Sequence, residues 1–528
     1  MRVRELFFVS TVGAALLGSG GCSFVAVEDI DPDMTTNPAD CIALNADPTL
    51  ATGDDCLRWQ LVDGFCRIGT RDTDGDGAKD AECAAADEVV DCDPEDPTRA
   101  PQLAELCDGI DNDCDDRTDE DVLSPTTPSA TQVATGVENV SFAAPSASAR
   151  VAALFTSPAG TPQNVLTTAR FAGTGSGTVA VAGTPLTAPA RDGATRGSTA
   201  LAALDSQSYV AAVVPAGGCR AVVLGTLSTE SGGTDLSFPA GHLADGLPDA
   251  AAETCSSAVM PALLRARTPA LGASASRVLA AWVAGPFIDT CGVAASAVPV
   301  LVNGAAFNAG TRVLTPSVAA ALSLGDTYDA SGPAVVSLGS DRFVAAHADG
   351  SDVVLSRVAV DASGAVTLLD AVRHDVGAGA DVGDLALALV DATHLALAYR
   401  VGCGSQARVM VALQGLGANA GALASTLGAS RAVEMSSVAQ RRPQLAVRDL
   451  PVGVTVVWEV GASLRVRQLD EGAVPLGAVQ TAYTSAGTLG AGHHVYPLPD
   501  SPAFGVLVSE SSGGGGSALQ SFELRCAR

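Results

Sequence analysis

Carboxylates stand at every second residue in three short stretches between residues 72 and 120. Oxygen ligands at this spacing let a loop wrap a hard cation, and a Gly at position 6 permits the sharp turn that such a loop needs. The first stretch, DTDGDGAKD, has that Gly at Gly77, and its acids at positions 1, 3, 5 and 9 are Asp72, Asp74, Asp76 and Asp80. Without a cation these anions would repel one another at close range. The sequence therefore predicts a metal site, with calcium as its ion.

The residue at position 12 of this loop is Cys83, where an EF-hand keeps a bidentate Glu. This argues against an EF-hand with two long flanking helices. The loop instead resembles the small calcium loops of thrombospondin type 3 repeats, which are held by disulfides.

The other two stretches fit the scheme less completely. The middle stretch, DCDPED, supplies Asp91, Asp93 and Glu95 but has Arg99 at the ninth position, so we interpret its acids as partial ligands of a shared cluster. The third, DNDCDDRTDE, has Asp116 where Gly is expected, and its acids at positions 1, 3, 5 and 9 are Asp111, Asp113, Asp115 and Asp119. We rank the first site strongest and the third site next.

Taken together, DTDGDG, DCDPEDPTRAP and ELCDGIDNDCDDRTDE resemble the MopE-type metal-binding motif family of bacterial envelope proteins. The resemblance implies structural cysteines at Cys92, Cys107 and Cys114. It also implies metal-facing carboxylates at Asp91, Asp93, Asp108, Asp111, Asp113, Asp115, Asp119 and Glu120. Pro94 and Asp116 depart from the family pattern. The namesake is a copper protein, but the hard oxygen donors here favour calcium. A solvated acidic linker is the alternative, and the interleaved cysteines argue against it.

The first 22 residues, MRVRELFFVSTVGAALLGSGGC, read as an export signal. A basic start precedes an apolar run that is too short to span a bilayer as a helix. The ending resembles a bacterial lipoprotein signal in which Cys22 carries the lipid, although Ser19 departs from the usual aliphatic residue. An ordinary signal peptide is the alternative. The acidic segment that follows reads as a flexible tether.

The remaining cysteines are even in number, which supports disulfides in an exported protein. Their pairing cannot be derived from their spacing, and no C-x₂-C pair supports a zinc site. The candidates are Cys41, Cys56, Cys66, Cys83, Cys92, Cys107, Cys114, Cys219, Cys255, Cys291, Cys403 and Cys526. Seven lie up to Cys114 and five beyond it, so either one bridge joins the two regions or each region keeps a thiol.

Acidity is concentrated in the motif region. Residues 28–121 hold 29 of the 58 acidic residues and 6 of the 30 basic ones, which gives a local net charge of −23 out of −28. The rest of the chain is near neutral and offers no basic patch, which argues against a nucleic-acid partner.

From about residue 136 the chain consists of short apolar runs bounded by turn residues, with no sustained helical period. Seven runs recur at intervals of about 60 residues, and each is followed by a second run. They are residues 150–155, 209–214, 277–282, 342–347, 394–399, 454–458 and 504–508. The pattern predicts a mainly β protein with a β-propeller of about seven blades, and tandem β-sandwiches are the alternative. Within this pattern, His347 reads as a buried, hydrogen-bonded core residue, and His493 and His494 fall in a Gly-rich turn.

No phosphate-binding loop, nucleophile elbow or zinc-protease motif is present, so the sequence favours a protein without catalytic activity. We expect a lipid-anchored envelope protein of the outer membrane that binds calcium and, through its propeller, an unknown protein or carbohydrate. The alternative is a propeller hydrolase or lyase that acts on envelope carbohydrate, with structural calcium. The expected segments are a signal (1–22), a tether (23–40), a Cys-rich metal module (41–121), a linker (122–135) and the propeller (136–528).

Overall fold

The structure is a computed structural model, and it describes most of the chain between residues 56 and 526. The described ranges are 56–62, 65–74, 76–84, 90–101, 103, 105, 110–115, 123–135, 137–146, 149–156, 165–171, 179–181, 186–187, 198–205, 208–214, 222–228, 235–237, 266–284, 297–327, 332–376, 381–417, 421–449, 452–470, 472–498, 503–511 and 516–526. The chain divides into two compact units, Met1–Leu103 and Ala104–Arg528. The expected module 41–121 is therefore shared between the two units.

The first unit contains one antiparallel hairpin, formed by β1 (Leu57–Val62) and β2 (Phe65–Thr70). The acidic loop follows β2 directly. A parallel bridge between Lys79 and Val90 then brings the start of the second acidic stretch beside the end of the first.

The second unit is built from antiparallel sheets of four or five strands. Six of these sheets consist of consecutive strands, and a seventh combines strands from both ends of the unit. The first three sheets are β5 (Val137–Ser146), β6 (Ala149–Thr156), β7 (Val165–Phe171), β8 (Val179–Val181) and β9 (Leu186–Thr187); β10 (Ser198–Ala203), β11 (Ser208–Val214), β12 (Val223–Ser228) and β13 (Asp235–Ser237); and β14 (Ala266–Ala273), β15 (Arg277–Ala284), β16 (Val298–Asn308), β17 (Val313–Pro316) and β18 (Leu322–Thr327). The next three are β19 (Ala334–Ser337), β20 (Arg342–Asp349), β21 (Asp352–Val360) and β22 (Val366–Asp375); β23 (Val382–Leu389), β24 (His394–Val401), β25 (Arg408–Leu416), β26 (Leu423–Leu427) and β27 (Arg431–Ala432); and β28 (Gln440–Asp449), β29 (Val452–Val460), β30 (Ser463–Leu469) and β31 (Gln480–Thr484).

The seventh sheet joins β32 (Thr488–Pro497), β33 (Phe504–Ser511) and β34 (Gly516–Cys526) to β3 (Leu123–Pro125) and β4 (Ser129–Thr135). Both N-terminal strands pair with β34, so the two ends of the unit share hydrogen bonds. The segment 122–135, expected as a linker, is therefore part of this sheet. Pro125 and Pro128 argued against strands in this segment, because proline is depleted in strands and is tolerated mainly at their ends and edges.

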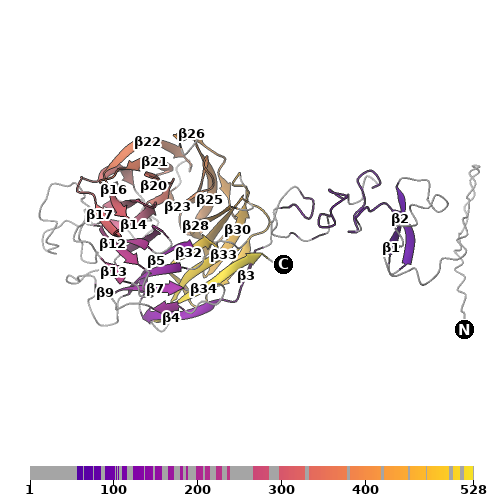
Figure 1. Ribbon diagram of the computed structural model, residues 1–528, viewed down its shortest axis with the longest axis horizontal. Coiled ribbons are helices and arrows are strands. Elements are labelled where there is room, and N and C mark those ends of the chain that lie inside the picture. The colour runs from indigo at the N-terminus through magenta and orange to yellow at the C-terminus, as the bar shows by residue number, and fades with distance from the viewer. Residues whose placement is uncertain are drawn as a thin grey trace, which may run out of the picture. The chain divides into compact units, whose positions relative to one another are not determined.

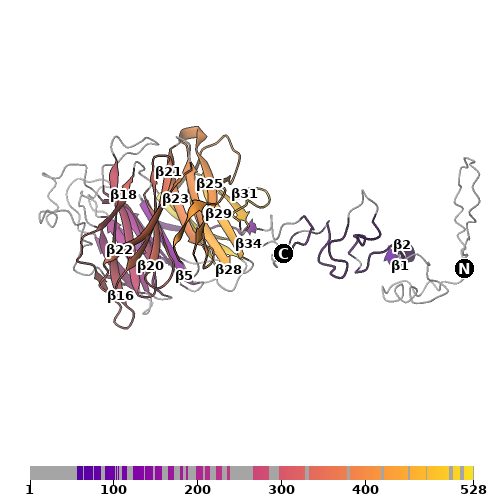
Figure 2. The ribbon, with the colours of Figure 1, turned by 90° about the horizontal axis from the view of Figure 1, so that it is seen from above.

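The first strand of every sheet contacts the first strand of the next sheet, and β32 contacts β5, which closes the ring. Figure 1 shows β5, β14, β23, β28 and β32 toward the middle of this unit, with β4, β22 and β26 toward its rim. Figure 2 shows the strands from a direction at right angles. This is a β-propeller arrangement, as predicted, and it excludes the tandem β-sandwiches.

Each of the seven apolar runs forms the second strand of a separate sheet, from β6 to β33. These strands are apolar on both faces because they lie between neighbouring strands and between neighbouring sheets. Trp282, Tyr399 and Trp458, which occupy equivalent places in three of the runs, are fully buried. Hydrophobic burial of this kind is the main source of stability in the propeller. One short 3₁₀ turn, Gly404–Gln406, stands among the described strands, and no helix in the described ranges is long and apolar enough to cross a membrane.

Candidate metal centre

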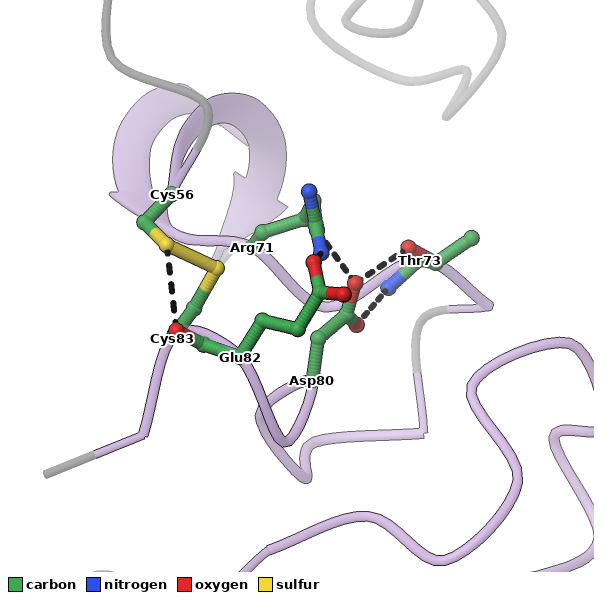
Figure 3. Close-up of a disulfide and its surroundings, with 6 residues drawn as sticks. All are labelled: Cys56, Arg71, Thr73, Asp80, Glu82 and Cys83. Atoms are coloured by element: carbon green, nitrogen blue, oxygen red, sulfur yellow. Dashed lines mark hydrogen bonds and ion pairs between the residues drawn. A yellow bond between two sulfur atoms is a disulfide. The ribbon is translucent and has the colours of Figure 1, made fainter. Parts of the chain in front are cut away.

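A disulfide ties the end of the first acidic loop to the start of the hairpin. Cys56 precedes β1 and is bonded to Cys83, with the two Cα atoms 5.1 Å apart (Figure 3). The backbone N–H of Arg71 donates to the carbonyl of Cys56 at 2.8 Å. Cys83, whose place at position 12 excluded a typical EF-hand, is thus structural. The prediction of a disulfide-stapled loop is confirmed for this pair.

The three leading acids of the loop converge. Asp72, Asp74 and Asp76 each offer a carboxylate oxygen, and these oxygens lie within 4.8 Å of one another. Short hydrogen bonds shape the turn: Gly77 N–H donates to Asp72 Oδ2 at 3.1 Å, and Ala78 N–H donates to Asp76 Oδ1 at 2.7 Å. The φ of Gly77 is +100°, which a side chain would strain, so Gly is required at position 6 as predicted.

Two oxygens of this group point into the interior without a hydrogen-bond partner, Asp74 Oδ2 and Asp76 Oδ2. The pKa of Asp74 is raised to about 6 by burial and by the neighbouring carboxylates of Asp76, Asp91 and Asp72. These effects outweigh a hydrogen bond from the Asp76 backbone, which lowers the pKa. The arrangement crowds negative charge around a small volume. It suits a bound cation, which would supply the missing partner for both oxygens.

Asp80, expected at position 9, lies elsewhere. Its Oδ2 accepts from Arg71 Nε and from Thr73 Oγ1, and its Oδ1 accepts from the Thr73 N–H at 3.1 Å (Figure 3). Burial raises its pKa, but the hydrogen bonds from Thr73 and Arg71 outweigh burial and hold the pKa below its ordinary value. Asp80 is therefore an anion paired with Arg71, and it is not part of the converging group.

The acids of the middle stretch differ from one another in their surroundings. Asp93 forms an ion pair with Arg99 at 2.8 Å, and Glu95 is exposed. Asp91 is only 2% exposed; its Oδ1 accepts from the Asp93 N–H at 2.8 Å, and its Oδ2 is buried without a partner. Of the three predicted ligands in this stretch, Asp91 alone is a buried carboxylate with an unused oxygen.

A second converging group lies in the other unit and consists of Glu105, Asp111 and Asp113, again with oxygens within 4.8 Å. Glu105 is 9% exposed, and its Oε1 accepts from the N–H groups of Asn112 at 2.6 Å and Asp113 at 2.9 Å. Sequence reasoning missed Glu105 because it lies outside the alternating pattern. The signal available was its place six residues before Asp111.

Other predicted residues are placed as follows. The Asp115 N–H donates to Asp111 Oδ1 at 3.2 Å, and Asp115 is not a member of the second group. Cys66, Cys92 and Cys114 are disulfide-bonded. Cys403 carries a thiol that donates to Asp381 Oδ2 at 2.9 Å. Outside the described residues lie Asp108, Asp119, Glu120, Cys22, Cys41, Cys107, Cys219, Cys255 and Cys291, and also the side chain of Cys526.

Charged side chains also meet where three neighbouring sheets of the propeller adjoin. Each of β23, β28 and β32 has a register shift near its start. The shifts place Asp384 and Arg442 at positive φ, 50° and 47°. We call the following residues the inter-sheet charge network: Asp384, Arg400, Arg442, Glu459 and His493.

The network is continuous across the three sheets. Arg400 Nε donates to Asp384 Oδ2 at 3.1 Å, and the Arg442 N–H donates to the same oxygen at 3.3 Å. Arg442 Nη1 lies 3.3 Å from Glu459 Oε1 and donates to the Gly490 carbonyl at 3.0 Å, while His493 Nδ1 lies 3.2 Å from Glu459 Oε1. Each carboxylate is thus held by cationic or imidazole partners.

The histidines correct two expectations. His493 and His494 lie in strand β32, not in a turn. His347 is 2% exposed, as expected, but its Nδ1 has no hydrogen-bond partner. Burial lowers the pKa of His347 to about 4, so the imidazole is neutral at physiological pH.

The two units together define a mainly β protein with a propeller and converging carboxylates in loops that carry disulfides. Residues 91–120 match the Cu-binding MopE family, whose model is described as "Putative metal-binding motif". The match confirms the resemblance for this segment and begins at Asp91, so the loop at residues 72–80 precedes it. A comparison with curated proteins finds no match.

Solved structures that resemble the chain include three glycosidases. An α-L-arabinanase from Penicillium chrysogenum is 9% identical, covers 76% of this chain and 98% of its own, and has a TM-score of 0.43. An α-L-arabinofuranosidase from Fusarium graminearum is 10% identical over 75% of this chain and 97% of its own, with a TM-score of 0.41. The NanB sialidase of Streptococcus pneumoniae is 10% identical over 75% and 70%, with a TM-score of 0.38. The propeller assignment depends on the strand order of the sheets in this chain and on the ring of contacts between them.

Proposed function

We propose that this protein binds calcium in its acidic loops and presents its propeller as a ligand-binding domain in the bacterial cell envelope. The observation that carries the metal assignment is the convergence of Asp72, Asp74 and Asp76, with two buried oxygens that lack partners. Burying a carboxylate oxygen without a partner costs free energy, and a cation in this position would remove that cost.

The donor set supports calcium over other metals. Only carboxylate oxygens converge in the two described groups, and the described cysteines of the motif region are held in disulfides. Hard oxygen donors suit calcium or magnesium, whereas copper prefers imidazole and sulfur ligands. Magnesium demands a small octahedron and keeps several of its waters, so a flexible loop of acids fits calcium better.

The experiment is a calorimetric calcium titration of the full chain with proteolysis in parallel. Extracellular calcium modules bind at about 10⁻⁴ to 10⁻³ M. At about 10 mM calcium, linkage then adds ~1.4 to 2.7 kcal/mol to the stability of the folded module. Calcium should protect residues 72–120 from cleavage, and magnesium should protect them less. Asp74→Asn should weaken binding, whereas Asp96→Asn, outside the converging group, should not. Equal cleavage with and without calcium would refute the assignment.

The anchoring proposal depends on the first 22 residues. Their basic start, apolar run and Ser-Gly-Gly-Cys ending support export and lipid attachment at Cys22, which would hold the protein at the outer membrane. Cys22→Ser should move the protein from the membrane fraction to the soluble fraction. Unchanged membrane association and processing of that variant would contradict the proposal.

We infer a blade count of seven from the ring of first strands and from the seven sheets. In this reading each sheet is one blade, and the sheet that joins β3 and β4 to β34 closes the ring. The ligand would be a protein or a carbohydrate of the envelope that contacts the ends of the inner strands.

The second candidate is a propeller hydrolase or lyase that acts on envelope carbohydrate, with calcium in a structural role. The observation that favours it is the inter-sheet charge network, which brings Asp384, Glu459 and His493 toward one another from three sheets. Because hydrogen bonds and charges from His493 and Arg442 outweigh burial and hold the pKa of Glu459 below its ordinary value, Glu459 stays ionised and suits the role of a nucleophile or of a carboxylate that stabilises positive charge. A general acid would have to be another group.

Release of reducing sugars from purified envelope polysaccharide tests this candidate. Hydrolysis that is lost in Glu459→Gln but kept in Asp326→Asn, a change at an exposed carboxylate on β18, would establish the enzyme. Binding of the polysaccharide without turnover would favour the ligand-binding reading.

A further inference from the structure

In the first acidic loop, the residue expected as the ligand at position 9 is engaged in other contacts. The alternating pattern assigns position 9 to Asp80, but the carboxylate of Asp80 already accepts from Arg71 Nε, Thr73 Oγ1 and the Thr73 N–H. An ionised carboxylate accepts about four hydrogen bonds, so little capacity remains. Turning Asp80 toward a cation would also leave the Arg71 guanidinium, whose side chain is 16% exposed, without this partner.

Asp91 is positioned beside the same loop by backbone pairing. The bridge between Lys79 and Val90 runs parallel, and the Asp91 N–H donates to the Lys79 carbonyl at 2.9 Å. Asp91 is the residue directly after Val90 in this bridge. Its negative charge acts on Asp74 in the loop, although Asp91 stands eleven positions after Asp80 and is not one of the three acids whose oxygens lie within 4.8 Å of one another.

Asp91 is a buried carboxylate with one oxygen that lacks a partner. It is 98% buried, one oxygen accepts from the Asp93 N–H, and Oδ2 has no partner. Burial, and then the negative charges of Asp76, Asp80 and Asp72, raise its pKa. Asp74 in turn feels the charge of Asp91. A buried anion that faces other anions is costly unless a cation lies among them.

We propose that Asp91 is the fourth carboxylate ligand of the first calcium site, together with Asp72, Asp74 and Asp76, and that Asp80 is a positioning residue that holds the loop through Arg71 and Thr73. This inference rests on the proposed calcium function. It means that the residue at which the family match begins completes a site whose other ligands precede the match. The first loop and the start of the family motif then share one metal site.

The test is a calcium titration of the full chain by calorimetry, in an Asp113→Asn background that weakens the second carboxylate group. Asp91→Asn and Asp74→Asn should each lower the affinity by about tenfold or more, whereas Asp96→Asn should leave it unchanged. Affinity that is unaffected by Asp91→Asn while Asp74→Asn weakens it would overturn the role of Asp91. If Asp74→Asn also has no effect, the proposed calcium function itself fails.

A second measurement covers the case in which Asp91→Asn disturbs the loop. Bound Tb³⁺ replaces calcium, and its luminescence lifetimes in H₂O and D₂O count the waters on the ion. Asp91→Glu, which keeps the charge, should retain the wild-type water count, and Asp91→Ala, which removes the ligand oxygen, should leave the ion with about one more water. Mass spectrometry of the Cys56–Cys83 bond reports whether each variant is correctly folded. An equal water count for wild type and Asp91→Ala with the disulfide intact would refute the proposal.

Discussion

Replacing Glu459 by Gln should destabilise the propeller at neutral pH and have less effect in acid. Glu459 is 8% exposed on β29, and its Oε1 lies 3.2 Å from His493 Nδ1 and 3.3 Å from Arg442 Nη1. The amide keeps the size of the side chain but removes the negative charge. The loss therefore reports the electrostatic part of the contact between the sheets of β28 and β32.

The expected magnitude follows from the exposure of the partners. Removing one member of a fully buried ion pair costs about 3–5 kcal/mol. The His493 side chain is 1% exposed, but the Arg442 side chain is 47% exposed, so water can replace much of what Arg442 loses. We expect a loss of ~1–3 kcal/mol. For a unit of roughly 400 residues the unfolding entropy is ~0.8 kcal/mol/K, which converts this loss to a fall in Tm of about 1–4 °C.

The pH dependence has a definite sign. Burial raises the pKa of Glu459. Hydrogen bonding to His493 and the charges of His493 and Arg442 lower it by more than burial raises it, so the folded-state pKa lies below the ordinary value of 4.5. A depressed pKa gives stability that is fully present above the unfolded value and is lost as the pH falls through the folded one. Wild type and Glu459→Gln should therefore differ at pH 7 and converge below pH 4.5.

The assay is urea unfolding followed by tryptophan fluorescence, since the neighbouring Trp458 is fully buried. Midpoints are compared from pH 7 to pH 3.5, with Asp326→Asn as an exposed control that should change stability by less than about 0.5 kcal/mol. Equal midpoints for wild type and Glu459→Gln at pH 7, or a difference that persists in full at pH 3.5, would refute the reasoning.

Three further predictions follow from the packing. Gly304→Ala would place a Cβ 2.4 Å from the Gly364 carbonyl and should cost ~1–3 kcal/mol, whereas Gly310→Ala has room and should unfold like wild type; equal melting of the two variants would contradict this. Cys83→Ser opens the bridge across a separation of 27 residues and should destabilise the hairpin unit by ~3–4 kcal/mol, seen as faster proteolysis under oxidising conditions; unchanged proteolysis would exclude it. A fragment that starts at residue 122 should melt cooperatively in chelator with a β-type spectrum and above a fragment that starts at 136, which lacks β3 and β4; equal melting temperatures would show that these strands add nothing.

The second strands of the sheets could be predicted from sequence because burial on both faces leaves a plain signal. A strand such as β20 or β29 is almost wholly buried, so apolar residues occupy most of its positions on both faces. The first strands gave no such signal. Their register shifts and polar residues, such as Asp384 and Arg442, break the alternation from which a strand is recognised.

Only the first half of the candidate metal site was predictable from the sequence. Spacing identifies Asp72, Asp74 and Asp76, because successive ligands on one turn have a fixed period. Spacing does not show that Arg71 lies against Asp80, since that contact depends on how the chain returns after the turn. The placement of Asp91 depends on a bridge between residues eleven apart, and Glu105 depends on backbone donors at Asn112 and Asp113. Contacts of this kind have no periodic signature.

The two units are stabilised by different physical means, and their sequences reflect this. The propeller alternates buried apolar strands with turns and needs few charges. Among the described residues of the first unit, the buried apolar side chains are Trp59, Ala78 and Ala100, a small core to set against the entropy of ordering the chain. Disulfides take over part of that role, and on the proposed assignment a cation supplies the rest, because the converging carboxylates oppose folding in its absence. The concentration of net negative charge in residues 28–121 is therefore what the proposed metal-dependent segment would require.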